Sequence, residues 1–354
     1  MFSHIINPFI ANAPMFGTAK ADLAAAVTKA GGFGFIGGGF DFTNSSAQLV
    51  SLEKELFKAR KLLDLKPLPD DAVQRQDNSV ESLPVGVGFL TFHSDDASAL
   101  ISLIWRHRPL GIWLFAQAEN QHRKLIPSLK SAGISWGMKI FVQIGSVKSA
   151  IEAVEDGADV IVVQGSDAGG HQFASNASII TSLPEISDAI KRLGRDVSIL
   201  AAGGIMDGRG IAAALALGAS GVVMGTRFAA TIESSSSEVA KSVMVSTRDG
   251  AVSTAKSTLH DALQGRPDFW PMAYDGRAVI SGLYRDVSTG AQSIEQAADT
   301  QKRAAAAGDG SNMVVWAGAG IGLIESILSA REVVEKSRME ANETMKSLSN
   351  QVGP

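Results

Sequence analysis

Short apolar runs alternate with amphipathic stretches over the first two thirds of the chain. The clearest run is Val-Ile-Val-Val at residues 160–163, and four β-branched residues in a row are typical of a strand buried on both faces. Comparable runs predict eight strands. The first lies within residues 7–15 and ends in a loop at residues 12–15, and the others lie at residues 33–36, 84–90, 110–117, 139–144, 160–164, 198–202 and 221–224. Stretches with helical spacing lie between them, at residues 18–29, 46–63, 95–106, 120–131, 147–155, 183–193 and 208–217.

Glycines separate three of these helices from the strands that follow. Gly31, Gly157 and Gly218 stand where a left-handed residue commonly ends a helix. At the other end of the first helix, Thr18 is the predicted N-cap. Eight strands alternating with helices predict an α/β protein with a (β/α)8 TIM barrel. An open doubly wound sheet is disfavoured, because its G-x-G-x-x-G first turn is missing.

The alternation stops after residue 228. The polar run at 234–237 is predicted to begin the last barrel helix. Residues 248–290 are irregular and contain several aromatic residues and prolines. We interpret them as lying over the barrel mouth, although a surface excursion without a catalytic role fits the same pattern. Two more helices are expected, at 293–307 and at 323–348, the second as a solvated outer helix, with a Gly-rich turn between them at 314–322.

These changes in pattern divide the chain into three predicted units. Residues 1–232 form the barrel, residues 233–312 form a covering segment with its own helices, and residues 313–354 form a C-terminal Gly-rich turn and a helix that packs on the barrel. Residues 66–82 are rich in proline, aspartate and other polar residues, which indicates an exposed insertion within the barrel.

Composition narrows the classes of function. The chain has 354 residues, 45% of them hydrophobic, and a net charge of −4, so no basic surface suggests nucleic acid. It has no cysteine, which excludes disulfides, thiolate metal sites and cysteine nucleophiles, and we predict no metal site. No secretory signal or membrane-spanning run is visible. We therefore expect a cytoplasmic protein that acts on a small molecule, as a monomer or a homodimer.

The strand at 160–164 runs into a Gly-rich turn that carries one histidine. Small residues at Ala168, Gly169 and Gly170 let the backbone lie flat against a planar ligand. His171 is the only strong acid–base group of the turn, and an imidazole accepts a proton near neutral pH. His171 is thus a candidate general base, with an ordinary surface histidine as the plain alternative.

Two further Gly-containing loops follow the seventh and eighth predicted strands. They read Ala202-Gly203-Gly204-Ile205-Met206-Asp207 and Met224-Gly225-Thr226-Arg227-Phe228. Loops at these two strands of a barrel commonly hold a phosphate, because glycine backbones leave N–H groups free to face an anion. We assign Asp207 to capping the next helix, and Arg227 to pairing either the phosphate or a barrel-end carboxylate.

These motifs together resemble the nitronate monooxygenase family, formerly called 2-nitropropane dioxygenases. Four pieces match in order: residues 12–15 (Asn-Ala-Pro-Met), 166–171, 202–205 and 224–228. Residues 316–324 resemble a late segment of the family. The resemblance implies a barrel that binds FMN without a covalent link and uses molecular oxygen, with His171 as the catalytic base. The implied cofactor contacts are Ala13, Pro14, Met15, Gly165, Gly169, Gly170, Ala202, Gly203, Gly204, Met224, Gly225 and Thr226.

At three positions near the implied flavin, this chain carries a different residue from many relatives. Many bacterial members carry Asn in the third strand, where this chain has Gly88, and Lys in the fifth strand, where it has Gln143. Gln143 can donate a hydrogen bond but brings no positive charge. Gln164 stands where many relatives have an acid, and could bond the ribityl chain.

The resemblance predicts FMN-dependent oxidation of alkyl nitronates, or of their parent nitroalkanes, by molecular oxygen. Two other interpretations stay open. One is an NAD(P)H-dependent flavin reductase acting on a quinone or an enoyl thioester. The other is a noncatalytic barrel that binds a flavin or another phosphate ligand.

Overall fold

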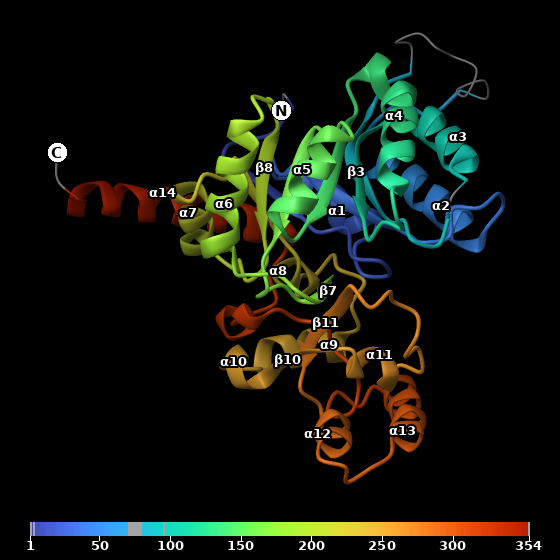
Figure 1. The fold of residues 1–354 in the computed structure, drawn as a ribbon, viewed down its shortest axis with the longest axis vertical. Coiled ribbons are helices and arrows are strands. Elements are labelled where there is room, and N and C mark those ends of the chain that lie inside the picture. The colour runs from blue at the N-terminus through green and yellow to red at the C-terminus, as the bar shows by residue number, and fades with distance from the viewer. Residues whose placement is uncertain (1, 3, 70–79, 95, 353–354) are drawn as a thin grey trace.

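A computed structural model gives the fold and describes residues 2, 4–69, 80–94 and 96–352. Eight parallel strands form the predicted barrel, and Figure 1 shows helices packed around its outside. The strands are β1 (Phe9–Asn12), β2 (Gly34–Gly39), β3 (Leu83–Leu90), β4 (Pro109–Phe115), β5 (Lys139–Ile144), β6 (Val160–Gln164), β8 (Ser198–Ala202) and β9 (Gly221–Met224). They are hydrogen-bonded in the order β1-β9-β8-β6-β5-β4-β3-β2.

A side chain helps to join the two ends of this sheet. Between β1 and β2 the backbone forms only an isolated bridge, from Ala11 to Phe33. Asn12, which is completely buried, continues the contact: its amide donates to the Phe35 carbonyl at 2.8 Å and its carbonyl accepts from the Phe35 amide at 3.0 Å. The Asn12 side chain therefore takes the place of strand pairing where the barrel closes.

The helices that follow the strands lie close to their predicted positions. They are α1 (Ala21–Lys29), α2 (Ala47–Leu62), α3 (Ser98–His107), α4 (Gln121–Gly133), α5 (Val147–Glu155), α6 (Ile179–Arg192) and α7 (Gly208–Ala216), with a short 3-10 turn, η1 (Ile134–Trp136), after α4. Gly31, Gly157 and Gly218 all have the expected positive φ, between 77° and 102°. The prediction of Thr18 as an N-cap is wrong. The Ala21 amide instead donates to the Glu55 carboxylate of α2 at 3.0 Å, so α1 is capped from a neighbouring helix.

The last helix of the barrel comes from the end of the chain. The polar run at 234–237 leads into α9 (Glu238–Ser246), capped by Ser237, but α9 contacts the C-terminal turn rather than the barrel wall, so that prediction is wrong. It is α14 (Ala330–Val352) that packs between α7 and α1. Its inner face is buried as far as Ala341, and residues 345–351 beyond it are exposed on all sides. Arg338 of α14 also donates to three backbone carbonyls beside α1 and the first strand.

The covering segment lies at one end of the barrel, at the bottom of Figure 1. It contains α10 (Gly250–Ser253), β10 (Thr254–Ser257), α11 (Leu259–Leu263), β11 (Tyr274–Val279), α12 (Gly282–Ser288) and α13 (Ile294–Ala307), and the C-terminal turn contains η2 (Ala319–Leu323). A three-stranded antiparallel sheet joins it to the barrel, in the order β10-β11-β7. Its third strand, β7 (Gly170–Phe173), belongs to the loop after β6, so His171 lies on a short strand rather than in an open turn.

The insertion predicted at 66–82 falls partly outside the described residues. Residues 66–69 and 80–82 belong to no helix or strand, and Arg60 holds both ends by donating to the carbonyls of Lys66 and Glu81. No helix in the described ranges is both long and apolar enough to span a bilayer.

Candidate functional site

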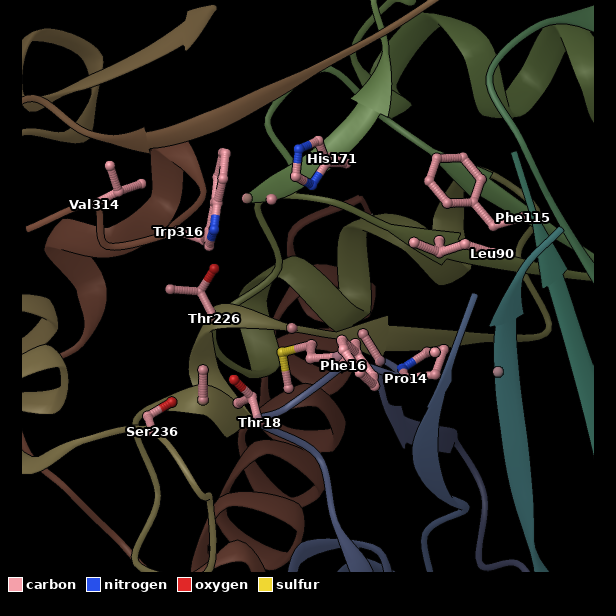
Figure 2. A pocket seen from close by; sticks show the side chains of 18 of the residues that line it. Pro14, Phe16, Thr18, Leu90, Phe115, His171, Thr226, Ser236, Val314 and Trp316 are labelled. Carbon is pink, nitrogen blue, oxygen red and sulfur yellow. The ribbon is translucent and has the colours of Figure 1, made fainter. Parts of the chain in front are cut away.

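A cavity of about 520 Å³ opens at the carboxyl ends of the barrel strands, beneath the covering segment. In Figure 2, His171 and Trp316 lie on one side of it, and Pro14, Phe16 and Thr18 lie on the other. A smaller cavity of about 60 Å³ adjoins it and is lined by the loops after β8 and β9. Both cavities share Ala13, Gln143, Gln164 and Thr226, so they are two parts of one site.

Most of the predicted site residues meet here. The larger cavity is lined by Ala13, Pro14, Met15, Gly88, Gln143, Gln164, Gly169, Gly170, His171, Gly225 and Thr226. The smaller one adds Ala202, Gly203 and Gly204. Gly165 and Met224 line neither. A Cβ on Gly165 would lie 2.7 Å from Ile179, and Met224 is buried with its carbonyl accepting from the Ala13 amide. These two residues support the cavity wall from behind.

Gly88 lies against another site residue. A Cβ at this position would come within 2.3 Å of the Pro14 ring. An asparagine, as in many bacterial members of the family that the sequence resembles, would therefore require residues 13–15 to move. The absence of a side chain at position 88 lets Pro14 lie against β3 at the cavity wall.

His171 is held on three sides by residues far away in the sequence. Its Nε2 lies 2.9 Å and 3.0 Å from the two carboxylate oxygens of Asp261 in α11. The Trp270 ring stacks on the imidazole with 3.9 Å between centroids, and the Trp316 ring lies 4.5 Å away at 48°. No other described group bonds the second ring nitrogen, Nδ1. The ring is fixed at the cavity wall with one nitrogen free.

Sequence reasoning did not single out Asp261, Trp270 or Trp316 as neighbours of His171. Trp270 is one of the aromatic residues of the segment 248–290, and Trp316 belongs to the late segment of the family resemblance. Asp261 gave no signal, since an acid in a short helix is usually a solvated residue. The covering segment therefore supplies groups to the site, and the alternative of a plain surface excursion is wrong.

The two glutamines at the cavity differ in how their polar atoms are satisfied. The Gln143 carbonyl oxygen accepts from the Trp113 indole at 3.1 Å, which leaves its amide N–H groups to donate. The Gln164 amide donates to the His171 carbonyl at 3.0 Å. Its carbonyl oxygen is buried and has no partner among the described residues. A buried acceptor without a donor is costly, so this atom is suited to a hydroxyl group of a ligand.

The loop after β8 presents free backbone amides to the smaller cavity. Gly203 and Gly204 have φ of +107° and +74°, and a Cβ on Gly203 would lie 2.8 Å from the Gly165 carbonyl. The amides of Gly203, Gly204 and Gly225 donate to no other described residue. Consecutive unpaired N–H groups in such a loop form a concave site for an anion.

The C-terminal turn closes this part of the site. The Gly318 amide donates to the Thr226 hydroxyl oxygen at 3.0 Å, and the Ala319 amide donates to the Asp167 carbonyl at 2.9 Å. A Cβ on Gly320 would come within 2.7 Å of the Gly204 carbonyl. The turn therefore lies directly against both Gly-rich loops. Thr226 keeps its hydroxyl proton available for an anion.

The two charged residues of the phosphate-type motifs have structural roles. Asp207 caps α7 as predicted, because its carboxylate accepts from the amides of Arg209 and Gly210. Burial opposes the charge on Asp207, but hydrogen bonds from Arg209 and the backbone outweigh it and lower the pKa of this carboxyl. Both predictions for Arg227 are wrong: its guanidinium donates twice to the Ser326 carbonyl at 3.1 Å and pairs with neither phosphate loop nor carboxylate.

The comparisons with known proteins agree with this geometry. A family model described as nitronate monooxygenase matches residues 2–338. A nitronate monooxygenase of Neurospora crassa is 39% identical over 97% of this chain and 91% of its own length. The nitronate monooxygenase npaC of Metarhizium robertsii is 33% identical over 97% and 93%. This chain belongs to the nitronate monooxygenase family.

Solved structures show the same fold. A FabK mutant from Thermotoga maritima has a TM-score of 0.72 at 26% identity, covering 97% of this chain and 95% of its own. A nitroalkane oxidase from Streptomyces ansochromogenes also has a TM-score of 0.72, at 24% identity over 97% of both chains. Members of the nitronate monooxygenase family are flavin-dependent oxidoreductases, so this protein is an oxidoreductase.

Charged side chains are sparse at the cavity. Of the described lining residues, Arg266 is the one permanently charged side chain of the larger cavity, and none is a carboxylate. Aromatic and aliphatic side chains make up most of the remaining wall, among them Phe16, Phe40 and Leu90. An apolar wall without acidic groups suits an anionic head group attached to an alkyl chain.

Proposed function

We propose that the protein binds FMN in the two joined cavities and oxidises alkyl nitronates with molecular oxygen. The observation that carries this proposal is that His171 lines the same continuous site as the unpaired amides of Gly203, Gly204 and Gly225. One end of the site is thus suited to a phosphate and the other to proton transfer.

The polar groups of the site fit FMN. The amides of Gly203, Gly204 and Gly225 and the Thr226 hydroxyl would hold the phosphate. The unpaired Gln164 oxygen would accept from a ribityl hydroxyl. Ala13, Pro14 and Met15 would lie against the isoalloxazine, with Gly169 and Gly170 on the wall beside it and Gln143 donating to the ring. FMN is favoured over FAD because the turn at Gly318 and Gly320 packs directly against both phosphate loops, where an adenosine would have to continue from the phosphate.

Bound FMN would supply the electron acceptor for the oxidation, as flavins do generally. The protein's own part is to orient the substrate, exclude water and move a proton. The apolar wall excludes water, and the stacked Trp270 together with the tilted Trp316 holds the imidazole in place. With a neutral nitroalkane, His171 would take the α-proton, and the electron pair left on carbon would spread onto the nitro oxygens. With a preformed nitronate, no proton has to be removed.

The test compares nitroethane with ethylnitronate in a His171→Asn variant. General-base assistance is typically worth about 10²–10⁴ in rate. Turnover of nitroethane should therefore fall by about 10²–10⁴-fold, turnover of ethylnitronate should change much less, and the FMN content should be unchanged. A parallel fall with both substrates, or loss of flavin, would mean that His171 has a structural role.

A third outcome concerns the parent protein itself. If it oxidises ethylnitronate but never nitroethane, His171 binds the nitro oxygens rather than acting as a carbon base. If it oxidises neither but NADH bleaches its flavin, the protein is a flavin reductase.

A further inference from the structure

Asp261 lies in the covering segment, yet its carboxylate reaches the candidate base. Both of its oxygens are within 3.0 Å of His171 Nε2, and the two side chains are only 5% and 16% exposed. Asp261 and His171 are ninety residues apart in the sequence. They meet because β7, which carries His171, pairs with β11 of the covering segment. A carboxylate so far from water binds a hydrogen-bond donor strongly.

We propose that Asp261 is a positioning residue that fixes the tautomer of His171, a role that rests on the proposed function of His171 as a base. A carboxylate accepts hydrogen bonds, so it selects the form in which Nε2 carries the proton and Nδ1 carries the lone pair. Nδ1 is the ring nitrogen that no other described group bonds. The lone pair is thus placed on the atom that is free to meet a substrate.

Packing keeps the ring from rotating out of this arrangement. Trp270 stacks on one face at 16°, and Trp316 contacts the ring at 48°. A 180° flip of the imidazole about its Cβ–Cγ bond would put Cε1 where Nε2 lies and break the bond to Asp261. Aromatic packing therefore fixes the plane of the ring, while the bond to Asp261 keeps Nε2 on the side of the carboxylate.

The pair also stabilises the product of proton transfer. When the α-C–H bond of a nitroalkane breaks, the proton goes to Nδ1 and the electron pair goes to the nitro group. The ring becomes an imidazolium whose Nε2–H faces the Asp261 carboxylate. A buried carboxylate beside the charged ring stabilises it without taking its proton, as in the Ser-His-Asp arrangement.

Asp275 provides a matched control. It lies on β11 opposite Gln172, in the small sheet that contains His171; its side chain is 15% exposed, and its charge interacts with His171 through space. It makes no hydrogen bond to the imidazole, and its ion-pair partner is Lys256 at 3.6 Å. Asp275→Asn therefore removes a nearby negative charge, whereas Asp261→Asn removes a negative charge and puts an amide, which donates as well as accepts, in place of a carboxylate that only accepts.

The first measurement is independent of activity. The purified flavin-bound protein is labelled with ¹⁵N-histidine, and long-range ¹⁵N–¹H correlations show which nitrogen of His171 is protonated, with His171→Asn providing the assignment. We expect the Nε2–H form in the parent and in Asp275→Asn, and a change to the Nδ1–H form or a mixture in Asp261→Asn. Asp261→Glu should restore the Nε2–H form. A parent protein in the Nδ1–H form, or an unchanged tautomer in Asp261→Asn, would overturn the proposal.

The second measurement is the ratio of nitroethane to ethylnitronate turnover. Asp261→Asn should lower this ratio by about 10²-fold or more, up to the loss seen in His171→Asn, with FMN retained. Asp261→Glu should recover part of it, and Asp275→Asn should keep the parent ratio. An equal fall in turnover with both substrates would mean that Asp261 has only a structural role. If the parent turns over neither compound, the proposed function fails, and the tautomer measurement still decides the role of Asp261.

Discussion

Gly225 offers the sharpest test of where the flavin phosphate binds. Its φ of −96° is open to any residue, and a Cβ there would lie 3.7 Å from the Ala13 Cβ and 3.8 Å from the Met15 sulfur, which are ordinary contacts. Gly203 is unsuitable, because its positive φ and the nearby Gly165 carbonyl would strain any side chain. A substitution at Gly225 can therefore change the charge of the site without disturbing the fold.

The expected magnitude follows from the proximity of the new carboxylate to the phosphate. Two like charges about 4 Å apart near a protein surface repel by about 4 kcal/mol. That energy corresponds to a loss of about 10³-fold in affinity. Gly225→Asp should therefore weaken FMN binding by about 10³-fold or more, because the phosphate carries more than one charge. Gly225→Asn has the same shape without the charge and should lose less than about tenfold.

Binding is measured by titrating flavin-free protein with FMN and following the quenching of flavin fluorescence. Circular dichroism confirms that each variant has the parent's helix content. If Gly225→Asp binds FMN as tightly as the parent, the phosphate is held elsewhere. If Gly225→Asn is as defective as Gly225→Asp, the loss comes from bulk rather than charge, and the electrostatic reasoning is wrong.

Other expectations test the cofactor and the supporting structure. The pigment released by heat should have the mass of FMN, and FAD would contradict the closure of the phosphate loops by the C-terminal turn. Burial lowers the pKa of His122 from 6.5 to about 4, so the folded state disfavours its protonation and loses stability as the pH falls below 6.5. Unfolding by urea should show a loss of about 2 kcal/mol by pH 5 from this group, which His122→Gln should abolish. Asn12→Ala should lower the free energy of unfolding by about 3 kcal/mol, since it leaves two buried Phe35 groups unpaired, whereas Asn44→Ala on the surface should have little effect. Asp207→Ala should cost about 1 kcal/mol through the lost cap of α7 and leave FMN content unchanged.

The strands were the most predictable part of the fold. The boundaries of β5, β6, β8 and β9 match the prediction, because these strands are buried on both faces and read as continuous apolar runs. β1 ends at Asn12, where the predicted loop begins, and the Asn12 side chain turns to Phe35. Local patterning marks which residues are buried, but it does not show that a side chain completes the closure of the barrel.

The neighbours that distant segments of the chain find on the barrel were not predictable. Helix α14 fills the last place around the barrel although about a hundred residues separate it from β9. Its amphipathic pattern predicts a buried face but does not indicate that this face packs against α7 and α1. The covering segment brings Asp261 to His171 in the same way. The cavity residues Gly169 and Gly225 were predictable because parallel barrel strands place all their following loops at one end, and Pro14 was implied by the family resemblance.

The central claim is tested most directly by oxygen uptake of the purified, FMN-loaded protein. Ethylnitronate and NADH are supplied separately, and an oxygen electrode records consumption while the visible flavin band is followed under nitrogen. We expect ethylnitronate to bleach the flavin band under nitrogen and to drive oxygen uptake in air, with little response to NADH. Bleaching by NADH together with no oxygen uptake on ethylnitronate would contradict the assignment of nitronate oxidation to this protein.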